Sequence, residues 1–384
     1  MGPLLIVGGA DRIDQTDIYR AFLDNCTGGT EPSVAIIATA TSDPEDAFDK
    51  IRTKLLSAGP CRAALLEISN QREEWKGGAF KREVLDLIES ADGFWFTGGD
   101  QNMTIAALLE KDGSDTPALK AIREKNLRGA VIGGTSAGAA VMSDPMICGG
   151  ETSSSLFSLF GSGKWDSDVA LGKGLGFLKD ILVDQHFDMR SRMGRLIAAL
   201  NRTSFKYGLG ISENTALLVK DGVFRVYGAS SVFSVDMRDF SMDGRRARGI
   251  GISFFEKGDV FSADRGILDL RDKSPVGDRT VLSSLKPLST GVFSPYADLR
   301  NFLARQLMDN DESMLESDAG RSSKYVTSYV FDPSLFPGES VFPALELRFH
   351  KTNGRTEAYA DSRGGFAVVD VELEILSGNI SFSP

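Results

Sequence analysis

The chain carries, at residues 130–142, the sequence Ala130-Val131-Ile132-Gly133-Gly134-Thr135-Ser136-Ala137-Gly138-Ala139-Ala140-Val141-Met142. An apolar run, a turn of small residues and a second run of small residues predict a strand, a sharp turn and a helix. Such a turn exposes a serine hydroxyl above a sheet, because glycine and alanine neighbours leave room for the backbone and a substrate. The helix would also direct its first N–H groups at this point, where an oxyanion can be bound. Ser136 is therefore a candidate nucleophile, although one G-x-S-x-G motif also fits a phosphate-binding or purely structural turn.

The rest of the first half alternates short apolar runs with amphipathic stretches. We expect strands at residues 4–7, 34–39, 64–68, 93–97 and 130–133, and helices at 15–25, 47–58, 81–90, 103–111 and 118–126. This alternation is typical of an α/β fold with a mostly parallel sheet and helices on both faces. Ligands bind such sheets at the carboxyl ends of the strands. The glycine turns at residues 8–9 and 97–101 would lie at that edge, beside Ser136.

The second half has a different pattern. Residues 216–267 show the alternation of antiparallel strands joined by Asp-Gly and Lys-Gly turns. A polar linker is expected at 271–287, then a helical pattern at 296–307, an acidic and serine-rich segment at 309–323, and β-like runs to residue 384. We therefore expect a catalytic domain, residues 1–275, and a β-rich C-terminal extension, residues 290–384, in which no chemical motif is evident.

Composition narrows the class of protein. The 384 residues are 42% hydrophobic with a formal charge of −10, which indicates a globular protein and disfavours a nucleic-acid partner. An acidic protein attracts cationic substrates. Three cysteines match no metal-ligand spacing, so we expect reduced thiols and neither a metal nor a cofactor. The apolar run at 4–7 is too short for a signal peptide and no run reaches the length of a membrane span, so the expected location is the cytoplasm.

A second polar cluster follows the apolar run at 181–183. Asp184, Gln185 and His186 should lie at the carboxyl end of a strand, the edge inferred for Ser136. The chain has two histidines, and His350 falls in the extension. His186 is therefore the candidate base for Ser136, although a histidine at a strand end also serves structural roles.

Three arginines follow this histidine, at positions 190, 192 and 195. Their forked guanidinium donors suit carboxylates, so they favour a site that binds a substrate carboxylate. The alternative is a solvated turn in which they pair with Asp184 and Asp188.

Two glutamates are candidates for the acid that orients the histidine. Glu151 lies between Ser136 and His186, and Glu213 follows another strand-like run. Either could be an ordinary surface carboxylate, and spacing alone does not choose between them.

Five motifs, in the order in which they follow one another along the chain, resemble those of the cyanophycinases and related aspartyl dipeptidases. These proteins are serine peptidases with a class I glutamine amidotransferase-like fold. The motifs lie at residues 6–10, 96–101, 134–139, 184–187 with the three arginines, and 210–216. The resemblance, which covers about residues 1–270, implies that Ser136 is the nucleophile, His186 the base and Glu151 the acid, since the family acid is expected between serine and histidine. It also implies an oxyanion hole formed by the N–H groups of Gly99 and Ala137. The substrate pocket that it implies is lined by Gln101, Asp184, Gln185, Arg190, Arg192, Arg195 and Glu213.

The implied activity is hydrolysis of cyanophycin, multi-L-arginyl-poly-L-aspartate, to β-Asp-Arg dipeptides by a Ser-His-Glu triad. Alternatives are an aspartyl or isoaspartyl dipeptidase, an α/β-hydrolase-type esterase, and a non-catalytic ligand-binding or assembly domain. A homodimer is the family expectation. The extension has no counterpart in compact family members, so its role and the exact substrate stay open.

Overall fold

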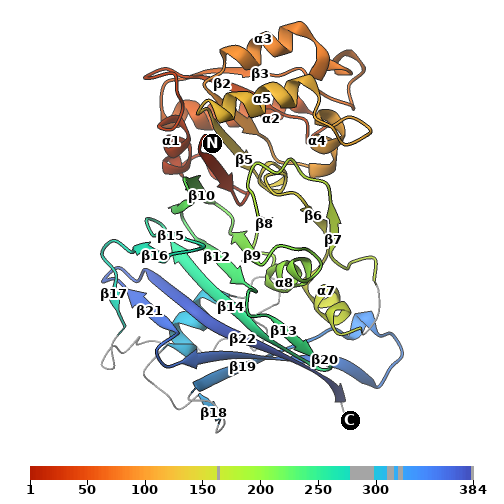
Figure 1. Cartoon of the computed structure of the whole chain (residues 1–384), viewed down its shortest axis with the longest axis vertical. Coiled ribbons are helices and arrows are strands. Elements are labelled where there is room, and N and C mark those ends of the chain that lie inside the picture. The colour runs from red at the N-terminus through yellow and green to blue at the C-terminus, as the bar shows by residue number, and fades with distance from the viewer. Residues whose placement is uncertain (162–164, 277–297, 309–314, 319–322, 382–384) are drawn as a thin grey trace.

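Five parallel strands form one side of a large sheet, with β3 at its edge (Figure 1). The computed structural model describes residues 1–161, 165–276, 298–308, 315–318 and 323–381. The strands lie in the order β1-β5-β4-β2-β3, and they are β1 (Leu4–Val7), β2 (Ser33–Ile37), β3 (Arg62–Leu65), β4 (Gly93–Phe96) and β5 (Val131–Thr135). Because side chains alternate along a strand, Leu4 and Ile6 lie in one core and Leu5 and Val7 in another.

Helices cover both faces of these strands. One face carries α1 (Thr16–Leu23) and α2 (Pro44–Ala58), and the other α3 (Arg82–Ser90) and α5 (Pro117–Leu127). The short helix α4 (Gln101–Leu108) follows β4. The Thr116 side chain accepts a hydrogen bond from the Leu119 N–H and so begins α5. The predicted α/β fold is confirmed, and each expected strand and helix overlaps the observed one.

Antiparallel strands extend this sheet beyond β1. The hairpin β10 (Thr215–Lys220) and β11 (Val223–Gly228) is closed by Asp221 and Gly222, both with positive φ, as a tight turn of this kind requires. β15 (Val260–Ser262) and β16 (Gly266–Asp269) follow. The parallel part of the sheet is thus limited to the first five strands.

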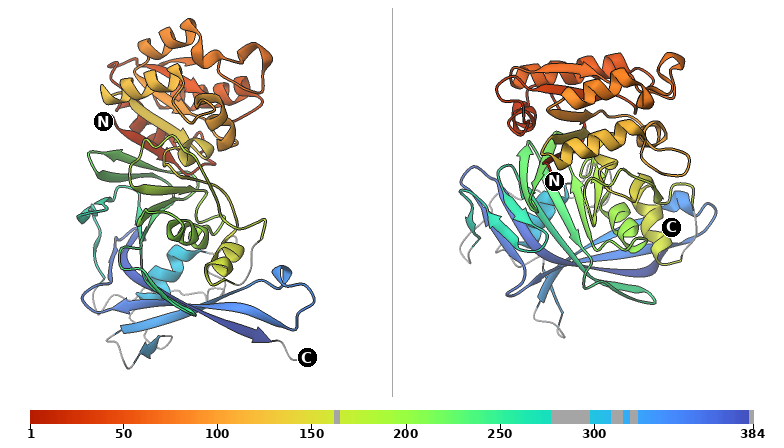
Figure 2. Two further views of the ribbon diagram at one scale, coloured as in Figure 1. Left: turned by 45° about the vertical axis from the view of Figure 1, so that its right-hand side comes forward. Right: turned by 45° about the horizontal axis from the view of Figure 1, so that its top comes forward.

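A second sheet forms the opposite half of the molecule (Figures 1 and 2). Its main path runs β18 (Glu316–Asp318), β19 (Ser323–Phe331), β20 (Val341–Thr352), β22 (Phe366–Ser381), β14 (Arg246–Glu256), β12 (Ser231–Asp236), β9 (Tyr207–Ile211) and β8 (Ile181–Gln185). Three short strands attach to this path: β13 (Ser241–Asp243), β17 (Ser274–Pro275) and β21 (Glu357–Ala360). Since β14 pairs with β22, the segments expected as residues 1–275 and 290–384 share one sheet.

Helices also pack on this second sheet. They are α7 (Thr152–Leu159), α8 (Met193–Asn201), α9 (Leu299–Asn301) and the π-helical turn η3 (Phe302–Leu307). Figure 2 shows α7 and α8 between this sheet and the α/β half. The helical pattern expected at 296–307 is confirmed over residues 299–307. Residues 277–287 of the expected linker and much of the acidic segment at 309–323 lie outside the described residues.

The remaining short elements adjoin the site. They are α6 (Ala137–Ala140), the two-stranded pair β6 (Met146–Gly149) and β7 (Ala170–Gly172), and the 3-10 turns η1 (Glu73–Trp75), η2 (Gly78–Phe80) and η5 (Pro333–Leu335). Cys26, Cys61 and Cys148 are free thiols.

Candidate active site

Ser136 lies at the junction of β5 and α6, where the sequence predicts a sharp turn. Its backbone has φ 54° and ψ −111°, a conformation that L-residues rarely adopt. A Cβ on Gly134 would lie 2.3 Å from the carbonyl oxygen of Gly138, and a Cβ on Gly138 would lie 2.3 Å from that of Phe96. The backbone around Ser136 is therefore packed so closely that both flanking positions require glycine.

His186 and Glu213 continue a hydrogen-bonded chain that begins at Ser136. The Ser136 Oγ lies 2.9 Å from His186 Nε2, and His186 Nδ1 lies 2.6 Å from Glu213 Oε1. His186 follows β8 and Glu213 follows β9, and these parallel neighbours bring both side chains to the same edge of the second sheet. Such a chain can move a proton from a serine hydroxyl to an imidazole while the carboxylate orients the ring.

The glycine turn after β1 lies against the histidine. The His186 N–H donates to the Gly8 carbonyl at 2.7 Å, although β8 belongs to the second sheet and not to the first. Gly9 has φ 95°, and a Cβ there would lie 2.4 Å from His186 Nε2. The two sheets therefore meet at the site, with the nucleophile on one and the histidine and glutamate on the other.

Glu151, which the resemblance favours as the acid, does not contact His186 in this structure. It is an exposed residue that precedes α7, and no hydrogen bond to its carboxylate is found among the described residues. The partner of His186 is Glu213, expected as the second candidate acid or as a pocket residue. The physical reason is strand order: β9 lies beside β8, whereas the segment after Glu151 continues into the helix α7 on the second sheet.

Two backbone N–H groups adjoin the Ser136 turn. Gly99 has φ 138°, and a Cβ there would lie 2.0 Å from the Ala40 carbonyl oxygen, so this position requires glycine. Ala137 is the first residue of α6, and the opening N–H groups of a helix have no helical acceptor. No acceptor for the N–H of Gly99 or Ala137 is found in the described part of the chain. Both groups are therefore available to an oxyanion formed beside Ser136.

A buried carboxylate that sequence reasoning missed stabilises the strand end before Ser136. Asp11 accepts hydrogen bonds from the hydroxyls of Thr135 and Tyr19 and pairs with Lys54 at 2.7 Å. Burial opposes ionisation of Asp11, but the Lys54 charge and these hydrogen bonds outweigh it and lower the pKa of Asp11. The available signal was its place just after a strand and a Gly-Gly turn.

The arginine that lies deepest, Arg195, is committed to contacts within the protein. It is 5% exposed, its Nε lies 3.0 Å from Asp184 Oδ2, and its Nη1 donates to the Gly150 carbonyl at 3.0 Å. Asp184 is 1% exposed. These two residues, expected in the substrate pocket, instead neutralise each other between α8 and β8.

Arg190 and Arg192 lie closer to the histidine and affect its charge. Arg190 is exposed, and Arg192 donates to the Gln185 carbonyl. Burial lowers the pKa of Arg192 to about 10. The charge of Asp184 opposes this shift, and the charges of the neighbouring arginines add to it. Burial is also the main cause that lowers the pKa of His186, with the two arginine charges adding to it and Glu213 opposing it. His186 is therefore neutral at neutral pH, as a general base requires.

The two glutamines expected in the substrate pocket differ in their hydrogen bonds. Gln101 begins α4, and its Nε2 donates to the carbonyls of Ile147 and Cys148 at 3.1 and 3.0 Å. Gln185 is buried beside His186, and its Oε1 has no partner among the described residues. This oxygen is closed off from solvent, so it is a buried acceptor that the described residues leave without a partner. Among the residues that the structure describes, no cluster of His, Cys, Asp and Glu could hold a metal ion.

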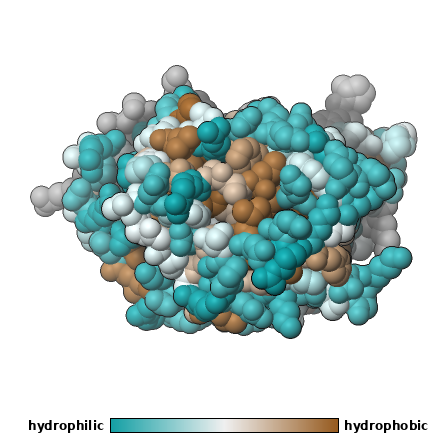
Figure 3. Space-filling model, turned by 90° about the horizontal axis from the view of Figure 1, so that it is seen from above, coloured by the Kyte–Doolittle hydropathy of each residue, from teal (hydrophilic) through white to brown (hydrophobic). Residues whose placement is uncertain are grey.

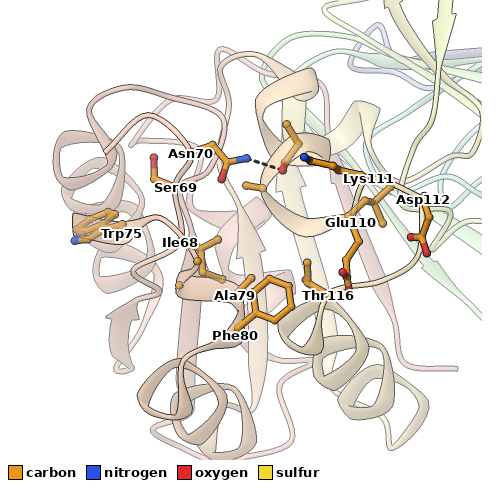
Figure 4. Close-up of a pocket in the computed structure, with 15 residues that line it drawn as sticks. Ile68, Ser69, Asn70, Trp75, Ala79, Phe80, Glu110, Lys111, Asp112 and Thr116 are labelled. Atoms are coloured by element: carbon orange, nitrogen blue, oxygen red, sulfur yellow. Dashed lines mark hydrogen bonds between the residues drawn. The ribbon is translucent and has the colours of Figure 1, made fainter. Parts of the chain in front are cut away.

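A pocket of about 490 Å³ lies elsewhere in the α/β half. Seen from above, that half gathers apolar side chains in a hollow bordered by polar ones (Figure 3). Figure 4 shows the pocket between the segment that bears Trp75 and Phe80 and the one that bears Lys111, with Asn70 donating to the Ala106 carbonyl. None of the residues of the Ser136–His186–Glu213 chain lines it.

No helix of the described residues is long and apolar enough to cross a membrane.

Comparison with known proteins identifies the family of the chain. Residues 4–227 match the model of peptidase family S51. The chain is 34% identical over 236 residues to a cyanophycinase of Geminocystis herdmanii, covering 61% of this chain and 80% of that protein. It is 32% identical over 292 residues to a cyanophycinase of Trichormus variabilis, and the alignment covers 75% of this chain and 90% of that protein. A peptidase structure from an acI-B1 Actinobacterium aligns with a TM-score of 0.48 and 19% identity, covering 68% of this chain and 97% of that one.

The fold and the family match together define a serine-type peptidase. The expectation of an enzyme is thus confirmed. More particularly, the chain belongs to peptidase family S51, as the resemblance of its motifs indicates. The family match ends at residue 227, so most of the second sheet lies beyond it.

Proposed function

We propose that this peptidase hydrolyses cyanophycin and releases β-Asp-Arg dipeptides. The observation that carries the proposal is the hydrogen-bonded chain of Ser136, His186 and Glu213, with separations of 2.9 and 2.6 Å between successive side chains. Relatives at 32–34% identity bear the name cyanophycinase, which favours this polymer over other peptides.

In the proposed mechanism, the Ser136 Oγ attacks the scissile carbonyl carbon while His186 Nε2 takes the hydroxyl proton. Glu213 keeps the imidazole oriented through Nδ1 and stabilises the imidazolium. The N–H groups of Gly99 and Ala137 bind the oxyanion. His186 then protonates the leaving amine, and a water molecule activated by the same imidazole hydrolyses the acyl-enzyme and restores Ser136.

The charges around the site suit this substrate. The guanidinium groups of Arg190 and Arg192 are the candidates for binding a free carboxylate of the polymer, since Arg195 is committed to Asp184.

A release assay tests the proposal. Purified protein incubated with cyanophycin granules should release β-Asp-Arg, measured by chromatography and mass spectrometry, and Ser136→Ala should lower kcat about 10⁶-fold. Ser57→Ala, a change on the exposed face of α2, is the matched control and should retain full activity. A serine-directed phosphonate should label the wild type at Ser136. An unlabelled protein without turnover contradicts the proposal.

A substrate panel separates the polymer-degrading activity from a dipeptidase. The panel contains cyanophycin, short β-Asp-Arg oligomers, isoaspartyl dipeptides and Asp-X dipeptides. We expect cleavage of the polymer and of the oligomers. Cleavage confined to the dipeptides would replace the proposed polymer activity with an aspartyl or isoaspartyl dipeptidase.

A further inference from the structure

The arginine-bearing loop, residues 187–192, is a compact turn that follows His186. The Ser191 N–H donates to the Asp188 carbonyl and the Arg192 N–H to the Phe187 carbonyl, both at 2.9 Å. Ser191 has φ 49°, a strained conformation for serine. Strained turns persist only where surrounding structure fixes them, so the neighbours of this loop determine where its arginines lie.

One neighbour is the C-terminal extension, because the Leu299 N–H at the start of α9 acts on the carboxylate of Asp188 in the loop. Asp298 and Arg300 face the same carboxylate with opposite charges, and Arg300 is itself paired with Glu256 at 3.0 Å. Burial and the Asp298 charge raise the pKa of Asp188 to about 7. The Arg300 charge and the Leu299 N–H act in the opposite direction and lower this pKa.

A second connection passes through helix α7. The Thr152 hydroxyl donates to the Ser191 carbonyl, and the Ser153 hydroxyl donates to Asp332 at 3.1 Å. The rings of Phe157 and Phe336 meet edge to face with centroids 5.6 Å apart. Helix α7 thus lies between the loop and the extension and contacts both.

The extension and the helices of the site share one hydrophobic core. Side chains from α7 and α8 cluster with side chains from α9, η3, β19, β20 and β22, all nearly or fully buried; among them are Leu156, Met193, Leu196, Leu303, Leu347 and Leu373. Such packing is dense and resists displacement. The loop is therefore fastened to a rigid body and not to a mobile tail.

We propose that Thr152 and Ser153 of helix α7 are positioning residues through which the extension fixes the arginine-bearing loop, so that the extension sets affinity for substrate and leaves the chemistry at Ser136 unchanged. This inference rests on the proposed function. The bonds of the site that involve Ser136, His186 and Glu213 join β5, β8, β9 and the Gly8 turn, and none of them involves the extension. Leu299 and Asp332 lie beyond residue 227, where the family match ends, so this arrangement is additional to the family core.

The test separates binding from chemistry in the full-length protein. Thr152→Val removes the donor to the Ser191 carbonyl, and we expect KM for a β-Asp-Arg trimer to rise about tenfold, since small displacements of positioning groups have large kinetic effects. The value of kcat and the rate of phosphonate labelling at Ser136 should stay within about twofold of wild type. Thr152→Ser retains the hydroxyl and should restore KM.

Two further variants complete the experiment. Ser153→Ala removes the bond to Asp332 and should raise KM about threefold, which also provides a test if Thr152→Val does not fold. Arg363→Ala breaks only an exposed ion pair of the extension, with Asp272, and should change nothing. An unchanged KM in both Thr152→Val and Ser153→Ala, or kcat and labelling that fall together, overturns the inference. A wild type that is neither labelled nor active refutes the proposed function itself.

Discussion

At the scale of single residues, the sharpest question is which glutamate serves His186. Glu213 Oε1 lies 2.6 Å from Nδ1, whereas Glu151 is exposed and separate from the ring. We expect Glu213→Gln to lower kcat about 100-fold or more, because the amide neither fixes the imidazole tautomer nor stabilises its charge. The matched change Glu151→Gln should alter kcat less than threefold. Steady-state kinetics on β-Asp-Arg oligomers decide, and the opposite ranking would restore Glu151 as the acid.

Sequence reasoning could bring Ser136 and His186 together because each follows an apolar run and carries a distinctive neighbourhood. It could not choose the acid, since two glutamates flank the histidine in the chain and only the order of the strands brings one of them near. The burial of Arg195 against Asp184 was equally inaccessible. A pair of opposite charges eleven positions apart gives no sign of whether water or protein surrounds it.

At the scale of elements, the turn between β5 and α6 depends on close backbone packing. A methyl group at Gly138 would lie 2.3 Å from the Phe96 carbonyl oxygen, whereas one at Gly149 would meet nothing within 4 Å. Gly138→Ala should therefore lower the free energy of unfolding by about 1–3 kcal/mol and reduce phosphonate labelling of Ser136, since the turn must shift. Gly149→Ala should stay within about 0.5 kcal/mol of wild type. Urea unfolding of both variants measures the difference, and equal stabilities would contradict the packing argument.

The strands and helices of the α/β half could be predicted because their alternation of apolar and polar residues is a local property. Membership of a sheet is not local. The strands β8 and β9 have the same apolar character as β1 and β5, yet β8 pairs with β9, and β9 pairs with β12, which is joined through β14 to strands from the end of the chain. That pairing places His186 and Glu213 opposite Ser136.

At the scale of the whole molecule, the extension is part of the structure that carries the site. The pairing of β14 with β22 and the shared core around α7 and α8 join residues on both sides of the boundary expected near residues 275–290. Composition suggested that boundary because the polar stretch between the two β-rich segments resembles a linker. Pairing between strands more than a hundred residues apart leaves no mark on local composition.

The burial of Asp188 near the Asp298 charge also makes global stability depend on pH. The folded-state pKa of Asp188 is about 7, above its ordinary value of 3.8, so folding favours the protonated form. Its contribution is therefore most favourable below the unfolded pKa and is lost as pH rises towards 7. Asp188→Asn cannot ionise, so its stability relative to wild type should increase by on the order of 2 kcal/mol between pH 5 and pH 8. Urea unfolding at both pH values, with Arg363→Ala as the control, measures this change. A stability difference that does not vary with pH would mean that Asp188 ionises freely and that the extension does not enclose it.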